Sequence, residues 1–281
     1  MEKIHVVVDS TANVPAELFA KYPNLHKTSL KLMLGAQEWA EDDIRASQLF
    51  DEMARVKAFP KTSQPPLGAF IQLFEKIIND GGRILVLTVS GALSGTVQGA
   101  NAAARSVDEA NIKVVDTQTT AAGMLNMALQ AIKLAESGAT LEQLVMHCKK
   151  VVSATHTIIL TDSLEYLHKG GRIGGASALF GTLLQIKPIL YLQEGKIAVL
   201  DKVRTRSRAI DRMLRELAKS ETLEYISVVH SGGQAEAQQV KIKIQAMNPE
   251  VDISVSEVGS ALAAHVGPNA FALIYQEKIE P

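Results

Sequence analysis

Short runs of β-branched residues alternate with helical patterns along the first half of this chain, and this alternation constrains the fold more than any other feature. Apolar runs of this length that end in polar residues are typical of strands buried in a parallel sheet. Such strands are expected at residues 4–8, 84–89, 112–115 and 155–160. A helix is expected at 119–137, and another begins at a capping box that opens with Thr140. Strands that alternate with helices imply βαβ units.

The pattern changes after Ser163. An apolar helix at 176–186 is followed by a predicted hairpin, in which a turn at 193–196 separates strands at 186–192 and 197–200. A hairpin of this kind belongs to an antiparallel or mixed sheet. The remaining elements are expected as helices at 206–219 and 234–247 and as strands at 225–229, 251–256 and 271–275.

We therefore predict an α/β protein of two domains with a boundary near Asp162. Residues 1–161 are expected to form a parallel-sheet α/β/α domain, and residues 162–281 a mixed-sheet α/β domain. The length of 281 residues exceeds the usual size of one domain and is consistent with this division.

The charge balance gives no global reason to bind nucleic acid or an anionic membrane, because 29 basic and 30 acidic residues leave a formal net charge of -1. Any such contact would need a local patch. No apolar stretch approaches the roughly 18 to 20 residues that span a bilayer. The first residues run into a strand pattern instead of a signal peptide, so a cytoplasmic protein is expected.

The residue types that hold metals or form disulfides give no recognisable pattern. The single cysteine, Cys148, excludes an internal disulfide. The seven histidines and the scattered carboxylates have no metal-binding spacing, and Glu41–Asp43 is interpreted as an exposed helix start. We therefore expect no metal.

Polar residues follow the predicted strands of the first half, where ligands bind in open α/β sheets. They include Asp9, Ser10, Thr11, Ser90, Asp116, Thr117, Asp162 and Ser163. Each alone is explained as a helix cap, but their combination indicates a binding cleft. The segment 90–98 adds hydroxyls and backbone N–H groups at the start of a helix, which is an anion site in chemical terms. The segment lacks the P-loop, dinucleotide and nucleophile-elbow patterns, so no catalytic motif is matched.

Five further positions have both a structural and a functional interpretation. Thr62 and Ser63 lie in a hydroxyl-rich loop that would either cap a helix or contact a ligand. His265 would be either a structural imidazole or the partner of a carboxylate. Arg172 lies in a glycine-rich basic segment that would be a flexible loop, a phosphate-binding turn or a connection that needs positive φ angles. Arg204 lies in a second basic segment that would form either a solvated helix face or a docking surface.

Seven segments of the chain, in order, resemble the DegV family, which includes the FakB proteins that present fatty acids to a fatty acid kinase. The segments are Asp9–Ser10, Thr62–Pro65, Leu93–Thr96, Asp162–Ile173, Lys187–Leu190, Val203–Thr205 and His265–Pro268. The resemblance runs nearly end to end and agrees with the two-domain fold expected above.

The resemblance implies that the protein binds one long-chain fatty acid and presents it to a kinase, with no chemistry of its own. The implied carboxylate contacts are Thr62, Ser63, Ser94, the Gly95 N–H and His265. The fatty acid tail would lie in the 162–281 domain. Arg172 and Arg204 are implied in contact with the kinase or the acyl phosphate. No cofactor besides the bound fatty acid is expected, and transient contact with a membrane surface is compatible with such a role.

Two other classes of function remain open from the sequence. The first is an enzyme acting on a phosphosugar or a small carboxylate, which would use the Ser94 loop for the anion and His265 for proton transfer. The second is a regulatory module in which Arg172 and the Arg204 region bind a protein.

Overall fold

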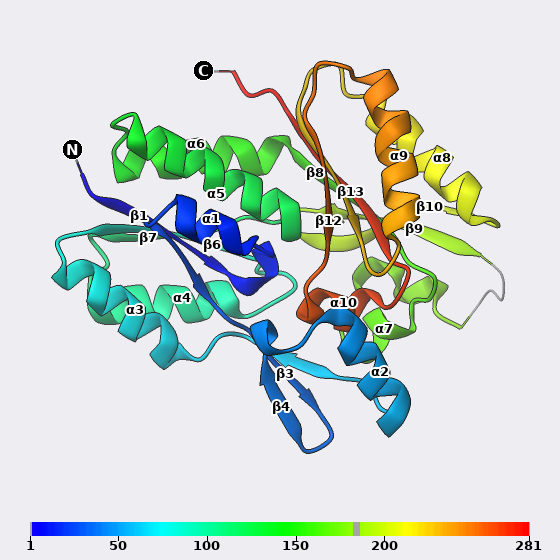
Figure 1. Ribbon diagram of the computed structural model, residues 1–281, viewed down its shortest axis with the longest axis horizontal. Helices are drawn as coiled ribbons and strands as arrows, with labels where there is room; N and C mark the ends of the chain where they lie inside the picture. The colour runs from blue at the N-terminus through cyan, green and yellow to red at the C-terminus, as the bar shows by residue number, and fades with distance from the viewer. Residues whose placement is uncertain (1, 182–185, 281) are drawn as a thin grey trace. The chain divides into compact units, whose positions relative to one another are not determined.

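A computed structural model of the chain describes residues 2–181 and 186–280. The contacts divide the chain into two compact units (Figure 1). Unit 1 comprises residues 1–31 and 63–153, and unit 2 comprises residues 32–62 and 154–281.

Unit 1 is built on a four-stranded parallel sheet with the strand order β2-β1-β6-β7. The strands are β1 (Ile4–Asp9), β2 (Leu25–Thr28), β6 (Arg83–Thr88) and β7 (Ile112–Asp116), and the short 3-10 helix η1 (Ser10–Ala12) follows β1. The helices are α1 (Ala16–Lys21), α3 (Leu67–Asn79), α4 (Thr96–Val107), α5 (Ala121–Glu136) and α6 (Leu141–Ala154). Within this unit, α3 and α4 lie on one side of the sheet and α5 on the other (Figure 1). Because helices cover both faces, all six residues of β1 are buried and the strand is apolar along most of its length.

The core of unit 1 and one helix start show how the sequence sets these elements. Phe70 and Phe74 of α3 pack with alanines of α4 against β6, where the small side chains let the two helices approach each other and the sheet. The predicted capping box at α6 is confirmed, since Gln143 Oε1 accepts from the Thr140 N–H at 2.8 Å and Thr140 Oγ1 accepts from the Gln143 N–H at 3.3 Å.

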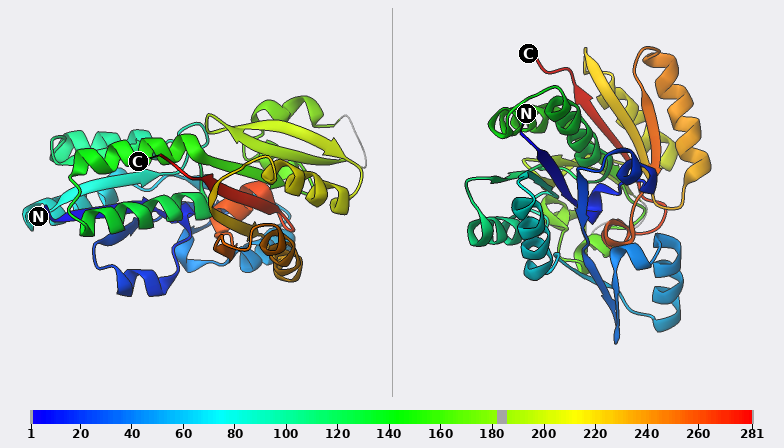
Figure 2. Two further views of the ribbon diagram at one scale, coloured as in Figure 1. Left: turned by 90° about the horizontal axis from the view of Figure 1, so that it is seen from above. Right: turned by 60° about the vertical axis from the view of Figure 1, so that its left-hand side comes forward.

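Unit 2 contains a six-stranded mixed sheet with the order β10-β9-β8-β13-β11-β12. The strands are β8 (Thr155–Leu160), β9 (Lys187–Gln193), β10 (Lys196–Val203), β11 (Leu223–His230), β12 (Ile253–Glu257) and β13 (Phe271–Glu277). Only β11 and β12 pair in parallel among these described strands. The helices are α7 (Glu165–Lys169), α8 (Arg206–Leu217), α9 (Gln234–Met247) and α10 (Ser260–Val266). Helices α8 and α9 lie on the same side of the sheet (Figure 2) and share one core cluster with it.

The predicted hairpin is confirmed as the antiparallel pair β9–β10. Glu194 and Gly195 have φ angles of 50° and 74°, which are the positive values that a two-residue hairpin turn requires. The α/β fold class, with a parallel sheet and a separate mixed sheet, is also confirmed.

A segment early in the chain forms a second layer of unit 2. It contains β3 (Lys31–Leu34), β4 (Gln37–Ala40), the 3-10 helix η2 (Glu41–Asp43), α2 (Ala46–Val56) and β5 (Lys61–Ser63). The strands form a small sheet of order β4-β3-β5, and α2 packs against α10. Leu32, Leu34 and Leu49 are at most 1% exposed, so the segment buries apolar side chains.

Three expectations from the sequence need correction. Strand 155–160 exists as β8, but it pairs antiparallel with β9 and β13 instead of joining the parallel sheet, whose fourth strand is β2. Unit 2 therefore begins at residue 154 instead of 162, and it also includes residues 32–62. The apolar helix expected at 176–186 is a 3-10 helix, η3 (Gly174–Leu179), and residues 182–185 lie outside the described residues. The positive φ angle at Gly181 is incompatible with one continuous α-helix over 176–186.

Within the described parts of the chain, no helix combines the length and the apolar character needed to cross a membrane.

Candidate functional site

Two carboxylates at strand ends of unit 1 hold the loop that carries Ser94. Asp9 Oδ1 accepts from the Thr11 N–H at 3.0 Å and from the Thr11 hydroxyl at 2.6 Å. Asp9 Oδ2 accepts from the Val89 N–H at 2.7 Å, which ties the end of β1 to the residue after β6. At the end of β7, both carboxylate oxygens of Asp116 lie 3.1 Å from the Gly91 nitrogen. The strand-end polar residues therefore fix a loop as well as capping the turn that follows β1.

The electrostatics of Asp9 are unusual for a carboxylate with three donors. Its side chain is completely buried, and desolvation raises the pKa of this carboxyl from 3.8 to about 6, although the hydrogen bonds from Thr11 and Val89 act in the opposite direction. Both carboxylate oxygens of Asp9 accept hydrogen bonds, from the Thr11 N–H and hydroxyl and from the Val89 N–H. We therefore assign it to loop positioning.

The Ser94 loop ends at the start of α4. The N–H of Ser94 donates to the Ser90 carbonyl at 3.1 Å, and the Ser94 hydroxyl lies 2.9 Å from the Thr96 hydroxyl. Gly95 is the N-cap residue of α4 and supplies no side-chain cap. A Cβ atom at Gly95 would collide with the carboxamide oxygen of Gln64, so only glycine lets these groups approach so closely. This helix start has the hydroxyl and backbone N–H groups that suit an anion.

In unit 2, His265 and Thr62 form one hydrogen-bonded pair. His265 lies in the last turn of α10, and its Nε2 is 2.7 Å from Oγ1 of Thr62 on β5. Burial lowers the pKa of His265 from 6.5 to about 4, and the positive charge of Arg172 acts in the same direction. The imidazole is therefore neutral at neutral pH and has one N–H donor and one acceptor nitrogen.

The glycine-rich stretch after α7 surrounds the other side of this imidazole. A Cβ atom at Gly170 would overlap His265 Nδ1, which explains the need for glycine at this position. Arg172 Nη1 donates to the Gly170 carbonyl at 2.6 Å, so the arginine holds the same turn of backbone. His265 Nδ1 is buried and has no hydrogen-bond partner among the described residues. Thr62, Gly170, Arg172 and His265 thus form one cluster.

The basic region around α8 divides into paired and exposed arginines. Arg206 pairs with Glu236 and Asp162, and Arg212 pairs with Asp201 and Glu216. Arg204 is exposed, just before the helix. Arg208 and Arg215 are exposed as well. Arg172, the other arginine expected to meet a partner, is partly buried and donates to the backbone.

The predicted carboxylate contacts are distributed over both units. Ser63, Ser94 and Gly95 belong to unit 1, and Thr62 and His265 to unit 2. Within unit 1, Gln64 lies against Gly95, a contact that the sequence did not suggest. Within unit 2, Thr62 and His265 are brought together although 203 residues separate them.

One residue beside this cluster was misinterpreted from the sequence. Asp42 and Asp43 are exposed as expected, but Glu41 is only 6% exposed, and its Oε1 accepts from the Ala261 N–H of α10 at 3.0 Å. Three consecutive acidic residues are typical of a solvated turn, so nothing in the sequence indicates that Glu41 is buried.

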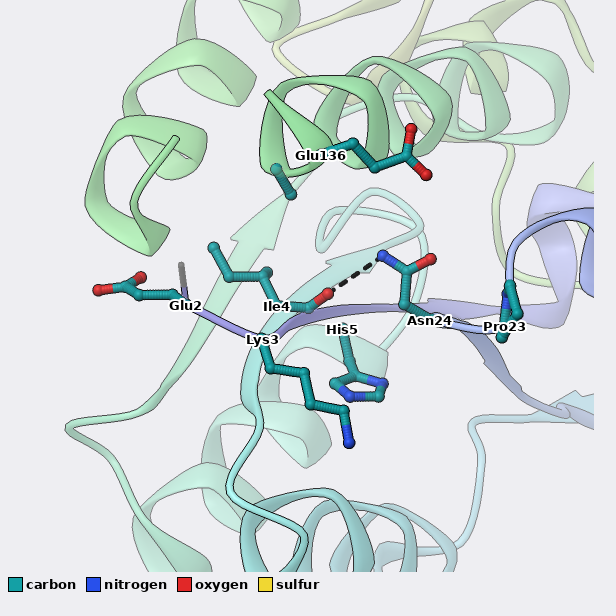
Figure 3. A pocket seen from close by; sticks show the side chains of 8 residues that line it. Glu2, Lys3, Ile4, His5, Pro23, Asn24 and Glu136 are labelled. Carbon is teal, nitrogen blue, oxygen red and sulfur yellow. Dashed lines mark hydrogen bonds between the residues drawn. The ribbon is translucent and has the colours of Figure 1, made fainter. Parts of the chain in front are cut away.

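A pocket of about 450 Å³ lies at the amino end of β1 in unit 1 and is lined by residues 2–5, 23–24 and 135–136 (Figure 3). The Asn24 side chain donates to the Ile4 carbonyl at 3.1 Å beside it. Ligands of open α/β sheets bind at the carboxyl ends of the strands, and this pocket is at the opposite end. None of the predicted site residues lines it.

Cys148 is buried and its pKa is raised to about 12, so it has no nucleophilic character at neutral pH. Over residues 2–181 and 186–280, no group of three or more His, Cys, Asp or Glu side chains is arranged to hold a metal ion.

Comparison with known proteins gives one family. A family model described as "Uncharacterised protein, DegV family" matches residues 3–278. A DegV domain-containing protein of Clostridium perfringens is 31% identical over 279 residues, which cover 97% of this chain and 98% of that protein. A DegV family protein from Thermus thermophilus, described by its fatty acid binding, has a TM-score of 0.92 at 30% identity, with 98% of this chain and 100% of that chain covered. Bacillus subtilis DegV, described as a fatty acid binding protein, has a TM-score of 0.89 at 28% identity, with 99% and 100% covered.

Proposed function

Because the chain belongs to the DegV family, we propose that it binds one long-chain fatty acid by its carboxylate and presents it to a fatty acid kinase, without catalysing the phosphoryl transfer. The Thr62–His265 hydrogen bond of 2.7 Å is the observation that carries this proposal. The descriptions of the Thermus thermophilus and Bacillus subtilis structures as fatty acid binding proteins support the choice of ligand.

The neutral state of His265 gives Thr62 a defined role. When the Nε2–H of the imidazole donates to Thr62 Oγ1, the threonine hydroxyl is free to donate its own proton to a carboxylate. Ser63, the Ser94 hydroxyl and the Gly95 N–H complete the proposed set of donors. His265 contributes to carboxylate binding through the threonine that it orients.

The head group and the tail of the fatty acid are expected to contribute different amounts to the free energy of binding. Burial of about 15 methylenes at roughly 0.8 kcal/mol each offers on the order of 12 kcal/mol before ordering costs. Hydrogen bonds to a charged carboxylate contribute about 1.5 to 3 kcal/mol each. The tail, which we place in unit 2, would supply most of the affinity, and the hydroxyls would fix the direction of the ligand.

The Ser94→Ala variant tests the head-group site. Loss of one charge-assisted hydrogen bond is expected to weaken binding of palmitate about 10- to 100-fold, measured by calorimetric titration of protein from which lipid has been extracted. Ser153→Ala, which removes an exposed hydroxyl in the same unit, serves as the matched control and should bind normally. An unchanged affinity in Ser94→Ala would remove this residue from the site.

The kinase contact is tested separately by reversing charge in the Arg204→Glu variant, because Arg204 is exposed and is not part of the Thr62–His265 cluster. We expect phosphorylation of the bound fatty acid by an added kinase to be lost, because like charges then oppose an acidic docking surface, while palmitate binding is retained. Arg105→Glu changes an exposed charge in unit 1 and should leave both properties intact. Loss of both properties in Arg204→Glu would contradict this division of roles.

The alternative of a phosphosugar or small-carboxylate enzyme is less well supported. It requires His265 to transfer a proton, but burial lowers the pKa of this imidazole to about 4, which leaves it unprotonated at neutral pH and makes it a weak base. Mass spectrometry of an organic extract from the purified protein would distinguish the two functions, since a carrier should yield about one fatty acid per chain.

A further inference from the structure

We propose that Glu41 is a positioning residue for His265, because its buried carboxylate fixes the first turn of α10 and thereby the place where the imidazole meets Thr62. The expected effect on ligand binding rests on the proposed function. The effect of Glu41 on the position of the imidazole is independent of that function and can be measured without ligand.

The contacts of Glu41 are directed at the start of α10. Its Oε1 accepts from the Ala261 N–H at 3.0 Å, and the Ser260 hydroxyl donates to the Glu41 carbonyl at 3.3 Å. The N-cap residue of this helix is Gly259, which provides no side-chain cap. Glu41 therefore supplies from a distant part of the chain the hydrogen bond that a local Ser, Thr or Asp usually provides.

The segment from β3 to β5 contacts α10 at both ends. Glu41 directly follows β4, and Thr62 lies on β5, while β3 joins these two strands in the sheet β4-β3-β5. Glu41 binds the first turn of α10, and Thr62 binds His265 in the last turn. Helix α10 has only seven residues, too few to be stable alone, so such tertiary contacts decide its position.

The surroundings of the imidazole leave little room for displacement. Gly170 closes one side so tightly that a Cβ atom there would overlap His265 Nδ1, and Thr62 Oγ1 lies 2.7 Å from Nε2 on the other. A shift of α10 by a fraction of an ångström would lengthen this hydrogen bond. A carboxylate on a residue that is only 6% exposed is costly unless it is hydrogen-bonded, which agrees with a specific task for Glu41.

The first test follows the imidazole nitrogens of His265 by NMR in ligand-free protein labelled with 15N-histidine, with His265→Gln to assign the signals. Glu41→Ala should shift both His265 nitrogen signals, whereas Glu41→Gln, which keeps an accepting oxygen, should restore them. Asp43→Ala removes a neighbouring exposed carboxylate and is the matched control. His265 signals in Glu41→Ala that coincide with those of the unmodified protein would overturn the proposal.

The second test is a double-mutant cycle on palmitate affinity. Glu41→Ala is expected to weaken binding about tenfold when His265 is present and less than about twofold in the His265→Ala background, because Glu41 acts through the imidazole. Equal effects in the two backgrounds would indicate general destabilisation and contradict the proposal. If the unmodified protein binds no fatty acid, the proposed function fails, and the NMR signals alone still decide the role of Glu41.

Discussion

Laurate is expected to bind about 200-fold more weakly than palmitate. The two ligands share the carboxylate and differ by four methylenes, each of which contributes roughly 0.8 kcal/mol when buried. If the tail supplies most of the affinity and the head group fixes the orientation of the ligand, the affinity must increase with the length of the tail in this way. Calorimetric titration of lipid-free protein with both acids, below their micellar concentrations, measures it.

Methyl palmitate is the control for this measurement. It keeps the whole tail but carries no charge, so it should lose the contribution of the Thr62 and Ser94 donors and bind more weakly than palmitate. Similar affinities for laurate and palmitate would mean that the tail is not buried, and the carrier function proposed above would then be untenable.

Stability should fall as the pH rises through the range in which Asp9 titrates. Burial places the pKa of this carboxyl at about 6 in the folded chain, above its ordinary value of 3.8. The unfolded chain therefore releases the proton first, and the stabilisation that protonated Asp9 provides is complete below about pH 4 and lost above about pH 6. The expected change is on the order of 3 kcal/mol.

The measurement compares the unmodified protein with Asp9→Asn by urea denaturation at several pH values. The asparagine side chain of this variant cannot titrate, so the difference in free energy of unfolding between the two proteins should decrease from pH 4 to pH 7. The other titrating groups cancel in this difference. A difference that does not depend on pH would mean that the three donors from Thr11 and Val89 keep Asp9 ionised throughout.

The sequence predicted elements better than it predicted their partners. Helix α9 was expected at 234–247 and occupies those residues, because the spacing of its buried residues Ala237, Val240 and Ile244 is a local pattern. Strand β8 was located correctly at 155–160, but a fully buried strand has the same apolar pattern in a parallel and in a mixed sheet. Its position between β9 and β13 depends on contacts with residues that are distant in the sequence.

The site shows the same limit. The hydroxyl loop around Ser94 follows β6 directly, so a strand-end pattern was sufficient to select it. The family resemblance placed Thr62 and His265 among the carboxylate contacts, but their hydrogen bond was not predicted, since no local pattern connects residues 203 positions apart. The burial of Glu41 was missed because it depends on a tertiary contact with α10. Neither the three consecutive acids nor the sequence of α10 indicates that this helix is capped by a residue far away in the chain.

The discontinuity of unit 2 has a consequence for synthesis on the ribosome. Residues 32–62 leave the exit tunnel well before residues 154–281, with which they are packed in the finished unit. Leu32, Leu34 and Leu49 are therefore synthesised before most of the unit in which they are buried, because residues 63–153 are translated in between. A nascent chain at that stage offers a target for chaperones, and a chain interrupted near residue 153 would keep this segment permanently without its partner.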